Sequence, residues 1–167
     1  SFIDKWLTMR LFNQLDGFLV QSNRVAEELT KLIPNANIEM RYHPIYDNYG
    51  PNINKAEARK KHGITAKNLI LYFGFVREYK GFDVLIDSFS MYVKENPFSK
   101  LLIAGVDDGM ENKLLNQIDS LGLIDSVFLI GLVDFNQKKE ILSNSSVFAL
   151  CSEFESFGIV ITEALAS

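Results

Sequence analysis

The sequence has one cysteine, Cys151, and two histidines among its 167 residues. One cysteine cannot form an internal disulfide, and together with two histidines it is too few for a zinc cluster. The scarcity of cysteine favours a reducing compartment. Lysine and arginine number 17 against 21 acidic residues, and no basic block occurs, which excludes the charge pattern of nucleic-acid-binding proteins. No apolar run approaches the roughly 20 residues needed to span a bilayer.

The residues that are present predict one folded domain with a substantial core. Hydrophobic residues make up 47% of the chain and charged residues 23%, which is typical of globular proteins. The chain begins at Ser1 instead of Met, and its last residues, TEALAS, predict a helix without a Gly, Asn or Pro to end it. We therefore expect a fragment of a longer protein. Asp4, Lys5 and Arg10 interrupt the opening segment, unlike the apolar centre of an export signal.

Apolar spacing predicts four elements in the first part of the chain: a helix over residues 2–14, a strand over 17–20, a helix from the N-cap Ser22 to just before Pro34, and a strand over 38–42. Residues 43–54, HPIYDNYGPNIN, are rich in Pro, Gly, Asn and Tyr and show no periodicity. This composition predicts a linker, and we interpret His43 as part of it because no catalytic partner can be assigned.

Beyond the linker, strands and helices alternate strictly. The predicted elements are helix 55–62, strand 69–75, helix 81–95, strand 100–104, helix 110–121, strand 126–130, helix 136–143, strand 147–150 and helix 158–167. Continuous apolar strands between amphipathic helices predict an α/β fold, a doubly wound parallel sheet of Rossmann-like type. Ligands bind such sheets where the strands end. The candidate ligand-binding loops are therefore the four that follow these strands, residues 74–81, 105–110, 131–136 and 151–158.

The first loop carries two cations three residues apart. Arg77 and Lys80 lie between Gly74 and Gly81, and glycine lets a backbone approach a ligand closely. Paired cations at a strand end could hold a diphosphate. A solvated turn is an equally good interpretation of the loop alone.

The fourth loop leads into a predicted helix that begins near Phe157 or Gly158. Free N–H groups at that helix start could bind an anion. Glu155 precedes the helix and Glu163 lies within it, so two carboxylates could accept hydrogen bonds from sugar hydroxyls. The alternative is an ordinary acidic residue at position 155 and a solvent-exposed Glu163.

The other two loops and Cys151 give weaker signals. Asp107 and Asp108 lack a third metal ligand in sequence reach, so we predict a turn near a helix start and no metal site. Asp134 is predicted to cap the next helix. Cys151 is interpreted as a small buried side chain in preference to a nucleophile.

Three segments together carry a resemblance to a known family. They are GFVREYKG after an apolar strand, the stretch IGLVDFNQKKEILSNSSVFALCS, and ESFGIVITEALA with its Glu155-x7-Glu163 spacing. From about Leu69 to the end, the chain closely resembles retaining glycosyltransferases of family four, which have the GT-B fold. The earlier DGFLVQSNRVAEEL and IEMRYHPIYD resemble the end of that family's N-terminal domain and the crossover into its C-terminal domain.

The resemblance implies a role for each matching residue. Lys80 and an arginine would neutralise the donor diphosphate. The family arginine directly follows the first glycine, Gly74, where this chain has Phe75, so Arg77 is the only local substitute. Glu155 would contact the donor sugar and Glu163 the ribose. The remaining implied contacts are amides of Phe157, Gly158 and Ile159 on phosphate, with Val133 and Lys138 beside the base.

The resemblance also implies the organisation of the whole protein. Residues 1–42 would be the end of an N-terminal domain or a crossover segment, and residues 55–167 a donor-binding domain truncated at its C-terminal end. A hexosyltransferase of this type transfers sugar with retention from a nucleotide diphosphate sugar to a saccharide or lipid-linked acceptor, such as a growing polysaccharide or glycolipid. The acceptor would be held by the missing N-terminal domain, so the isolated fragment is expected to be inactive. No metal and no cofactor are implied.

Two other functions stay open on the sequence: a noncatalytic nucleotide-binding module and a related GT-B sugar nucleotide epimerase. The two spaced glutamates favour a transferase over a simple phosphate binder, which has no use for carboxylates near an anion. We expect a cytoplasmic protein. Peripheral contact with the inner face of the membrane through Trp6 and Phe2 is the alternative to a helix that packs on the protein core.

Overall fold

The computed structural model describes residues 2–44, 56, 59–60, 65–155 and 157–167. The chain forms two compact units, Ser1–Pro44 and Ile45–Ser167. Most of the predicted linker 43–54 and of the predicted helix 55–62 lies outside the described residues.

The first unit pairs two short parallel strands and packs a helix on them. Its elements are α1 (Phe2–Phe12), β1 (Phe18–Val20), α2 (Asn23–Leu32) and β2 (Ile38–Met40). Ser22 caps α2 as predicted, because its side chain accepts a hydrogen bond from Val25 N at 3.3 Å. Within this unit α1 leaves Trp6 about half exposed.

The second unit is a parallel four-stranded sheet of order β5-β4-β3-β6. Its elements are β3 (Asn68–Phe73), the 3₁₀ turn η1 (Glu78–Lys80), α4 (Phe82–Glu95), β4 (Ser99–Ala104), α5 (Glu111–Ser120), β5 (Val127–Gly131), α6 (Phe135–Asn144), β6 (Val147–Phe148) and α7 (Ile159–Leu165). The predicted doubly wound α/β fold is confirmed.

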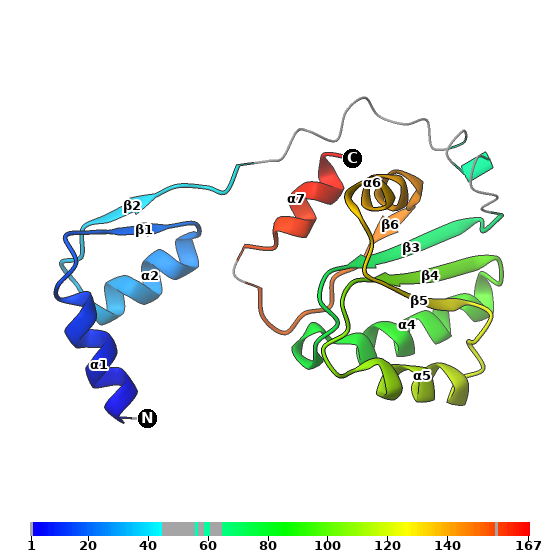
Figure 1. Ribbon diagram of the computed structural model, residues 1–167, viewed down its shortest axis with the longest axis horizontal. Coiled ribbons are helices and arrows are strands. Elements are labelled where there is room, and N and C mark those ends of the chain that lie inside the picture. Colours follow the sequence, from blue (N-terminus) through cyan, green and yellow to red (C-terminus); the bar gives the residue numbers. More distant parts are fainter. Residues whose placement is uncertain (1, 45–55, 57–58, 61–64, 156) are drawn as a thin grey trace. The chain divides into compact units, whose positions relative to one another are not determined.

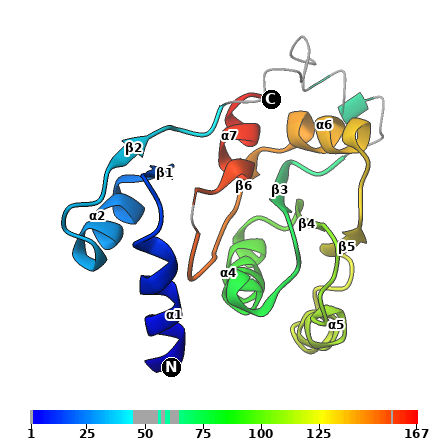
Figure 2. The same ribbon diagram turned by 60° about the vertical axis from the view of Figure 1, so that its left-hand side comes forward.

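Helices cover both faces of this sheet. Figures 1 and 2 show α4 and α5 on one face and α6 and α7 on the other. The core under α4 and α5 includes Tyr72, Phe82 and Ile103, each at most 1% exposed. Leu71 and Ala104 form the smaller core on the α6 side. Because both sheet faces are buried, the strands are apolar along their whole length.

Several element ends differ from the prediction. β3 ends at Phe73, two residues earlier than predicted, because Gly74 adopts a φ of 145° and turns the chain out of the strand. β6 is two residues long instead of four, and among the described strands it pairs only with β3. Asp134 caps α6 as predicted, in a reciprocal pair of hydrogen bonds with Gln137. None of the helices described is both long and apolar enough to cross a membrane.

Candidate functional site

The loops that follow the strands are joined at one edge of the sheet, the carboxyl edge. Val76 N donates to Val106 O at 2.9 Å, and Asp108 N donates to Val76 O at 3.0 Å. Gly105 N donates to Gly131 O at 2.8 Å. Main-chain hydrogen bonds therefore connect the loops after β3 and β4 with each other and with the end of β5.

Glycines allow the loops at this edge to approach each other closely. A Cβ on Gly105 would lie 1.7 Å from Gly74 O, and a Cβ on Gly81 would lie 2.2 Å from Cys151 O. Gly81 also has a φ of 68°, which disfavours other residues. The sequence suggested that Gly74 and Gly81 make room for a ligand, whereas in the structure both approach backbone of a neighbouring loop.

Lys80 and Glu155 form an ion pair between the loops after β3 and β6. The Lys80 side chain is mostly buried and lies over the Tyr79 ring. Ser152 Oγ donates to Glu155 Oε1 at 2.9 Å, so this carboxylate has two partners. Glu153 N donates to Tyr79 O at 2.9 Å and ties the two loops together. Two predicted site residues, 75 positions apart, thus meet at the carboxyl edge.

A second ion pair joins Lys138 of α6 to Glu163 of α7. The side chains are only 15% and 11% exposed. Lys138 Nζ also lies 4.8 Å from the centroid of the Phe73 ring, a cation–π contact. Burial of Glu163 contradicts the alternative in which this residue faces solvent. Val133 packs on the α6-side core.

Arg77 pairs with an acidic residue from the next loop. Arg77 Nε donates to Asp108 Oδ2 at 2.8 Å, and the guanidinium carbon lies 4.7 Å from the centroid of the Phe75 ring. A hydrogen bond with Tyr79, followed by the pairing with Asp108, raises the pKa of the Arg77 guanidinium above its ordinary value. The side chain is therefore a permanent cation at this edge, 43% exposed.

The segment leading into α7 differs from the prediction in one respect. The helix begins at Ile159, and Gly158 precedes it with a φ of 70° and no side-chain cap. With seven residues, α7 offers a shorter helix than the predicted 158–167. Phe157 is half-buried. The main-chain N–H groups at the start of α7 follow shortly after Glu155, whose carboxylate is paired with Lys80.

A pocket of about 430 Å³ runs along α6 next to the sheet. Val133 and Gln137 line it near the start of α6, and Asn144 lines it near the end. Lys138 and the Lys80–Glu155 pair are not part of its wall. The pocket thus provides space beside Val133, one of the predicted contacts of the base, and extends away from the two ion pairs.

Three residues at this edge escaped the sequence analysis. Asp108 was interpreted only as a turn residue, and Ser152 and Tyr72 were not singled out. Tyr72 Oη donates to Phe75 O at 3.0 Å, and burial, with the nearby Glu155 charge, raises the pKa of Tyr72 well above its ordinary value. The hydroxyl therefore stays protonated and anchors the first loop. For Ser152, its short distance along the sequence from Glu155 was a signal that could have indicated a place in the site.

The predicted turn at residues 105–110 is confirmed, with Asp107 as its centre. Its carboxylate accepts hydrogen bonds from the N–H groups of Gly109, Met110 and Glu111. Across the described parts of the chain, no group of three His, Cys, Asp or Glu side chains is placed to hold a metal ion. Cys151 is half-buried, and burial raises the pKa of its thiol.

At the carboxyl edge, cations thus lie beside acidic side chains. Lys80, Arg77 and Lys138 each form an ion pair with an acidic residue from a different loop or helix. Fixed cations stabilise phosphate charge, and carboxylates accept hydrogen bonds from hydroxyl groups. The arrangement suits a ligand that carries both phosphates and sugar hydroxyls.

The fold and this edge define a Rossmann-like domain with a polar site where the strands end. A family model described as "Glycosyl transferases group 1" matches residues 54–167. The chain therefore belongs to the group 1 glycosyltransferases, and its second unit has the fold of their GT-B C-terminal domain. This confirms the family indicated by the sequence motifs.

Relatives with different names match most of this chain. The chain is 29% identical to mannosylfructose-phosphate synthase of Agrobacterium fabrum over 161 residues, which cover 92% of this chain and 34% of that protein. It is 28% identical to the lipopolysaccharide core biosynthesis mannosyltransferase LpsB of Rhizobium meliloti, with 94% and 44% covered. The chain thus spans less than half the length of these relatives.

Solved structures share the fold at low sequence identity. Anabaena Alr3699/HepE, in complex with UDP and glucose, superposes with a TM-score of 0.83 at 20% identity over 99% of this chain and 46% of that one. Sucrose-phosphate synthase of Thermosynechococcus elongatus superposes with a TM-score of 0.84 at 19% identity over 99% and 42%.

Proposed function

We propose that this chain supplies the donor-binding part of a glycosyltransferase, which binds a nucleotide diphosphate sugar at the carboxyl edge. The observation that carries the proposal is the convergence of two lysine–glutamate pairs there, Lys80–Glu155 and Lys138–Glu163. The sequence predicts Lys80, Glu155 and Glu163 as site residues from its loops and spacing, and the family resemblance adds Lys138. Membership of the group 1 family supports the same function.

In this proposal the diphosphate lies beside Lys80 and Arg77. Lys80 Nζ reaches Glu155, so a phosphate at this point would lie next to the carboxylate that accepts hydrogen bonds from the donor sugar. Arg77 adds a second positive charge from the same loop, which begins at Gly74. Amides of Phe157, Gly158 and Ile159 would donate to the phosphates.

The nucleoside lies beside Lys138 and Glu163. The Glu163 carboxylate accepts hydrogen bonds from the ribose hydroxyls, and Lys138 holds that carboxylate in place. Space for a base is available next to Val133 and along the α6 pocket. Different residues thus serve the sugar, the diphosphate and the nucleoside.

The chemistry follows from these charges. In the transfer, the bond between the sugar's anomeric carbon and the diphosphate oxygen breaks, and a bond to an acceptor oxygen forms as that oxygen loses its proton. Negative charge grows on the leaving diphosphate, so cations fixed in advance stabilise the transition state more than the bound donor. Similarity to the family supports retention of the anomeric configuration.

The names of the relatives indicate more than one class of acceptor. Their names include a mannosylfructose-phosphate synthase and a lipopolysaccharide core mannosyltransferase, so a saccharide or a lipid-linked acceptor suits the proposal equally. A hexosyl donor fits both names. We place acceptor binding outside residues 55–167, because the carboxyl edge is assigned to the donor.

Lys80→Ala tests the proposal. We expect this substitution to weaken binding of a nucleoside diphosphate by about 10- to 100-fold, because a charge-assisted hydrogen bond contributes about 1.5–3 kcal/mol. Binding of the parent nucleoside should be unchanged, since the ammonium acts on phosphate charge. Calorimetric titration of the intact protein with UDP and uridine, or with GDP and guanosine, measures both.

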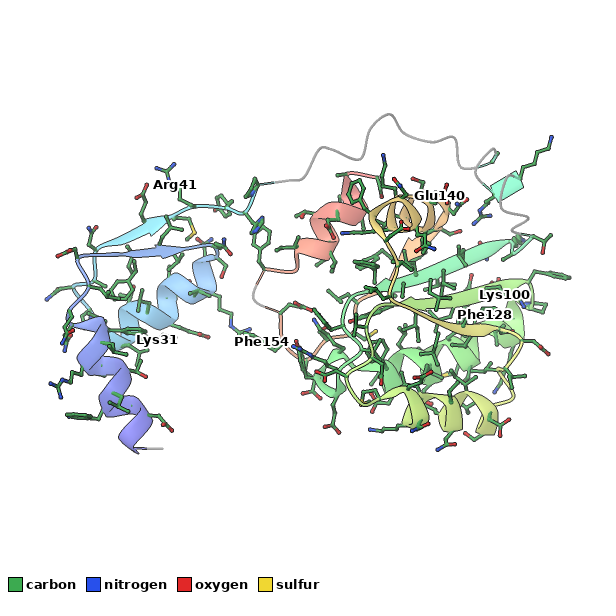
Figure 3. All side chains as sticks on the ribbon, in the orientation of Figure 1. Lys31, Arg41, Lys100, Phe128, Glu140 and Phe154 are labelled. Atoms are coloured by element: carbon green, nitrogen blue, oxygen red, sulfur yellow. The ribbon has the colours of Figure 1, made fainter. Side chains whose placement is uncertain are left out.

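Lys100→Ala is the matched control. Figure 3 shows Lys100 and Phe128 where β4 and β5 begin, at the edge opposite Phe154 and the carboxyl-edge loops. The control removes the same charge far from the proposed site and should leave both affinities unchanged. Equal losses for nucleotide and nucleoside in Lys80→Ala would remove Lys80 from the phosphate site.

A further inference from the structure

Asp108 is held firmly beside the proposed diphosphate site. Its main-chain N–H donates to Val76 O at 3.0 Å. The preceding residue, Asp107, accepts three hydrogen bonds from the start of α5. These hydrogen bonds hold the main chain at residues 107 and 108, from which the Asp108 carboxylate extends to Arg77.

This carboxylate holds Arg77 through one nitrogen. The bond runs from Nε to Asp108 Oδ2 at 2.8 Å. A guanidinium is planar with five N–H donors, so pairing through Nε directs the edge formed by the two Nη groups away from Asp108. That edge has the geometry that binds phosphate oxygens in pairs.

An aromatic ring supports the same guanidinium from a second direction. Residues 75 and 77 flank Val76, and Arg77 has extended backbone, with φ −124° and ψ 157°. The guanidinium carbon lies 4.7 Å from the Phe75 ring centroid. The Phe75 main chain is itself fixed, because its carbonyl accepts from the buried Tyr72 hydroxyl. The Phe75 ring and the Asp108 carboxylate, with the hydrogen bond to Tyr79, together restrict a side chain that otherwise has many rotamers.

We propose that Asp108 is a positioning residue that holds Arg77 over the Phe75 ring, with its Nη edge turned toward the diphosphate of a bound nucleotide. This inference rests on the proposed function and adds a residue to it. Asp108 acts through Arg77 and does not touch the ligand. The pair contributes little to folding, because its side chains are 43% and 59% exposed.

Charge and positioning predict opposite effects of removing Asp108. A carboxylate near a diphosphate repels it, so loss of that charge by itself tightens nucleotide binding. Loss of positioning weakens binding, because Arg77 must then be ordered when the nucleotide binds. The sign of the change in affinity therefore decides between the two.

We expect Asp108→Ala to weaken UDP binding by about three- to tenfold, which corresponds to one ordinary hydrogen bond, and to leave uridine binding unchanged. Asp108→Asn keeps an acceptor for Nε and should show a smaller loss. In an Arg77→Ala background, Asp108→Ala should cause no further loss. Titration calorimetry of the intact protein with UDP and uridine, or with GDP and guanosine if that base is preferred, gives all the values.

Asp119→Asn on α5 is the control for net charge and should change neither affinity. Tighter or unchanged UDP binding in Asp108→Ala overturns the inference, as does an equal loss in the Arg77→Ala background. A loss that uridine shares would show general damage to the site and also overturn it. If Lys80→Ala fails to separate UDP from uridine, the proposed function falls and the role of Asp108 with it. If Lys80→Ala weakens UDP binding and spares uridine binding, then one of these contrary results for Asp108→Ala rejects only the positioning role of Asp108.

Discussion

Each glutamate of the Glu155-x7-Glu163 spacing is paired with a lysine from another segment of the second unit. Glu155 is shared between Lys80 and Ser152, whereas Glu163 has Lys138 as its ion-pair partner. A carboxylate can accept several hydrogen bonds at once. Both carboxylates can therefore keep their lysine and still accept a ligand hydroxyl.

Separate roles for these two carboxylates lead to a prediction at the residue scale. Glu163→Gln should weaken binding of a nucleotide and of its sugar conjugate alike, by about 10- to 100-fold, because the ribose is common to both. Glu155→Gln should spare the free nucleotide and lower kcat/KM for sugar transfer, because the partner proposed for Glu155 is the donor sugar. Titration and steady-state kinetics of the intact protein measure these effects.

Glu153→Gln removes a neighbouring exposed charge and should change neither quantity. Because Glu163 is buried with Lys138, the melting temperature of each variant must be measured beside its affinity. Indistinguishable effects of Glu155→Gln and Glu163→Gln on binding and turnover would end the assignment of one to the sugar and the other to the ribose.

At the scale of elements, the site depends on how closely the loops after β3 and β6 approach. Gly81 lies between η1 and α4, against the carbonyl of Cys151. The neighbouring Glu153 N–H donates to Tyr79 O. Any side chain at position 81 must push the two loops apart, and this would separate Lys80 from Glu155.

Gly81→Ala tests this dependence. The Cβ would lie 2.2 Å from Cys151 O, and the left-handed backbone adds strain, so we expect a loss of about 2 kcal/mol or more in stability. Nucleoside diphosphate affinity should also fall. Gly122→Ala is a matched control, with a φ of 66° but no atom within 4 Å of the added Cβ. It should cost about 1 kcal/mol and leave the affinity intact; similar results for both variants would contradict the close-approach interpretation.

The sequence predicted the elements of the second unit well, because buried parallel strands are continuous apolar runs and helices between them are amphipathic. Strand ends were less predictable: β6 is short because it pairs with β3 alone among the described strands. The sequence predicted Lys80, Glu155 and Glu163 as site residues from its loops and spacing, and the family resemblance added Lys138. It did not predict which lysine pairs with which glutamate. Those contacts, and the pairing of Asp108 with Arg77, depend on loop packing across the sheet.

At the scale of the whole molecule, the chain corresponds to only part of the proteins that it resembles. The second unit matches the group 1 family, and the chain covers 34% to 44% of the relatives compared above. Glycosyl transfer needs an acceptor held in line with the donor. That residues 1–167 alone transfer no sugar, and that residues 1–42 belong to an N-terminal domain or crossover, stay predictions.

Donor binding by the intact protein without a metal ion is the central claim, and saturation-transfer NMR against a panel of nucleotide sugars in EDTA tests it most directly. We expect at least one nucleotide sugar to show transfer to its ribose and its sugar protons. Lys80→Ala should abolish or strongly reduce this signal, and Lys100→Ala should not. In the proposed site, fixed lysine and arginine charges would neutralise the diphosphate, so chelation should not weaken binding. Absence of binding across the panel, or binding that returns only with magnesium or manganese, would contradict the claim.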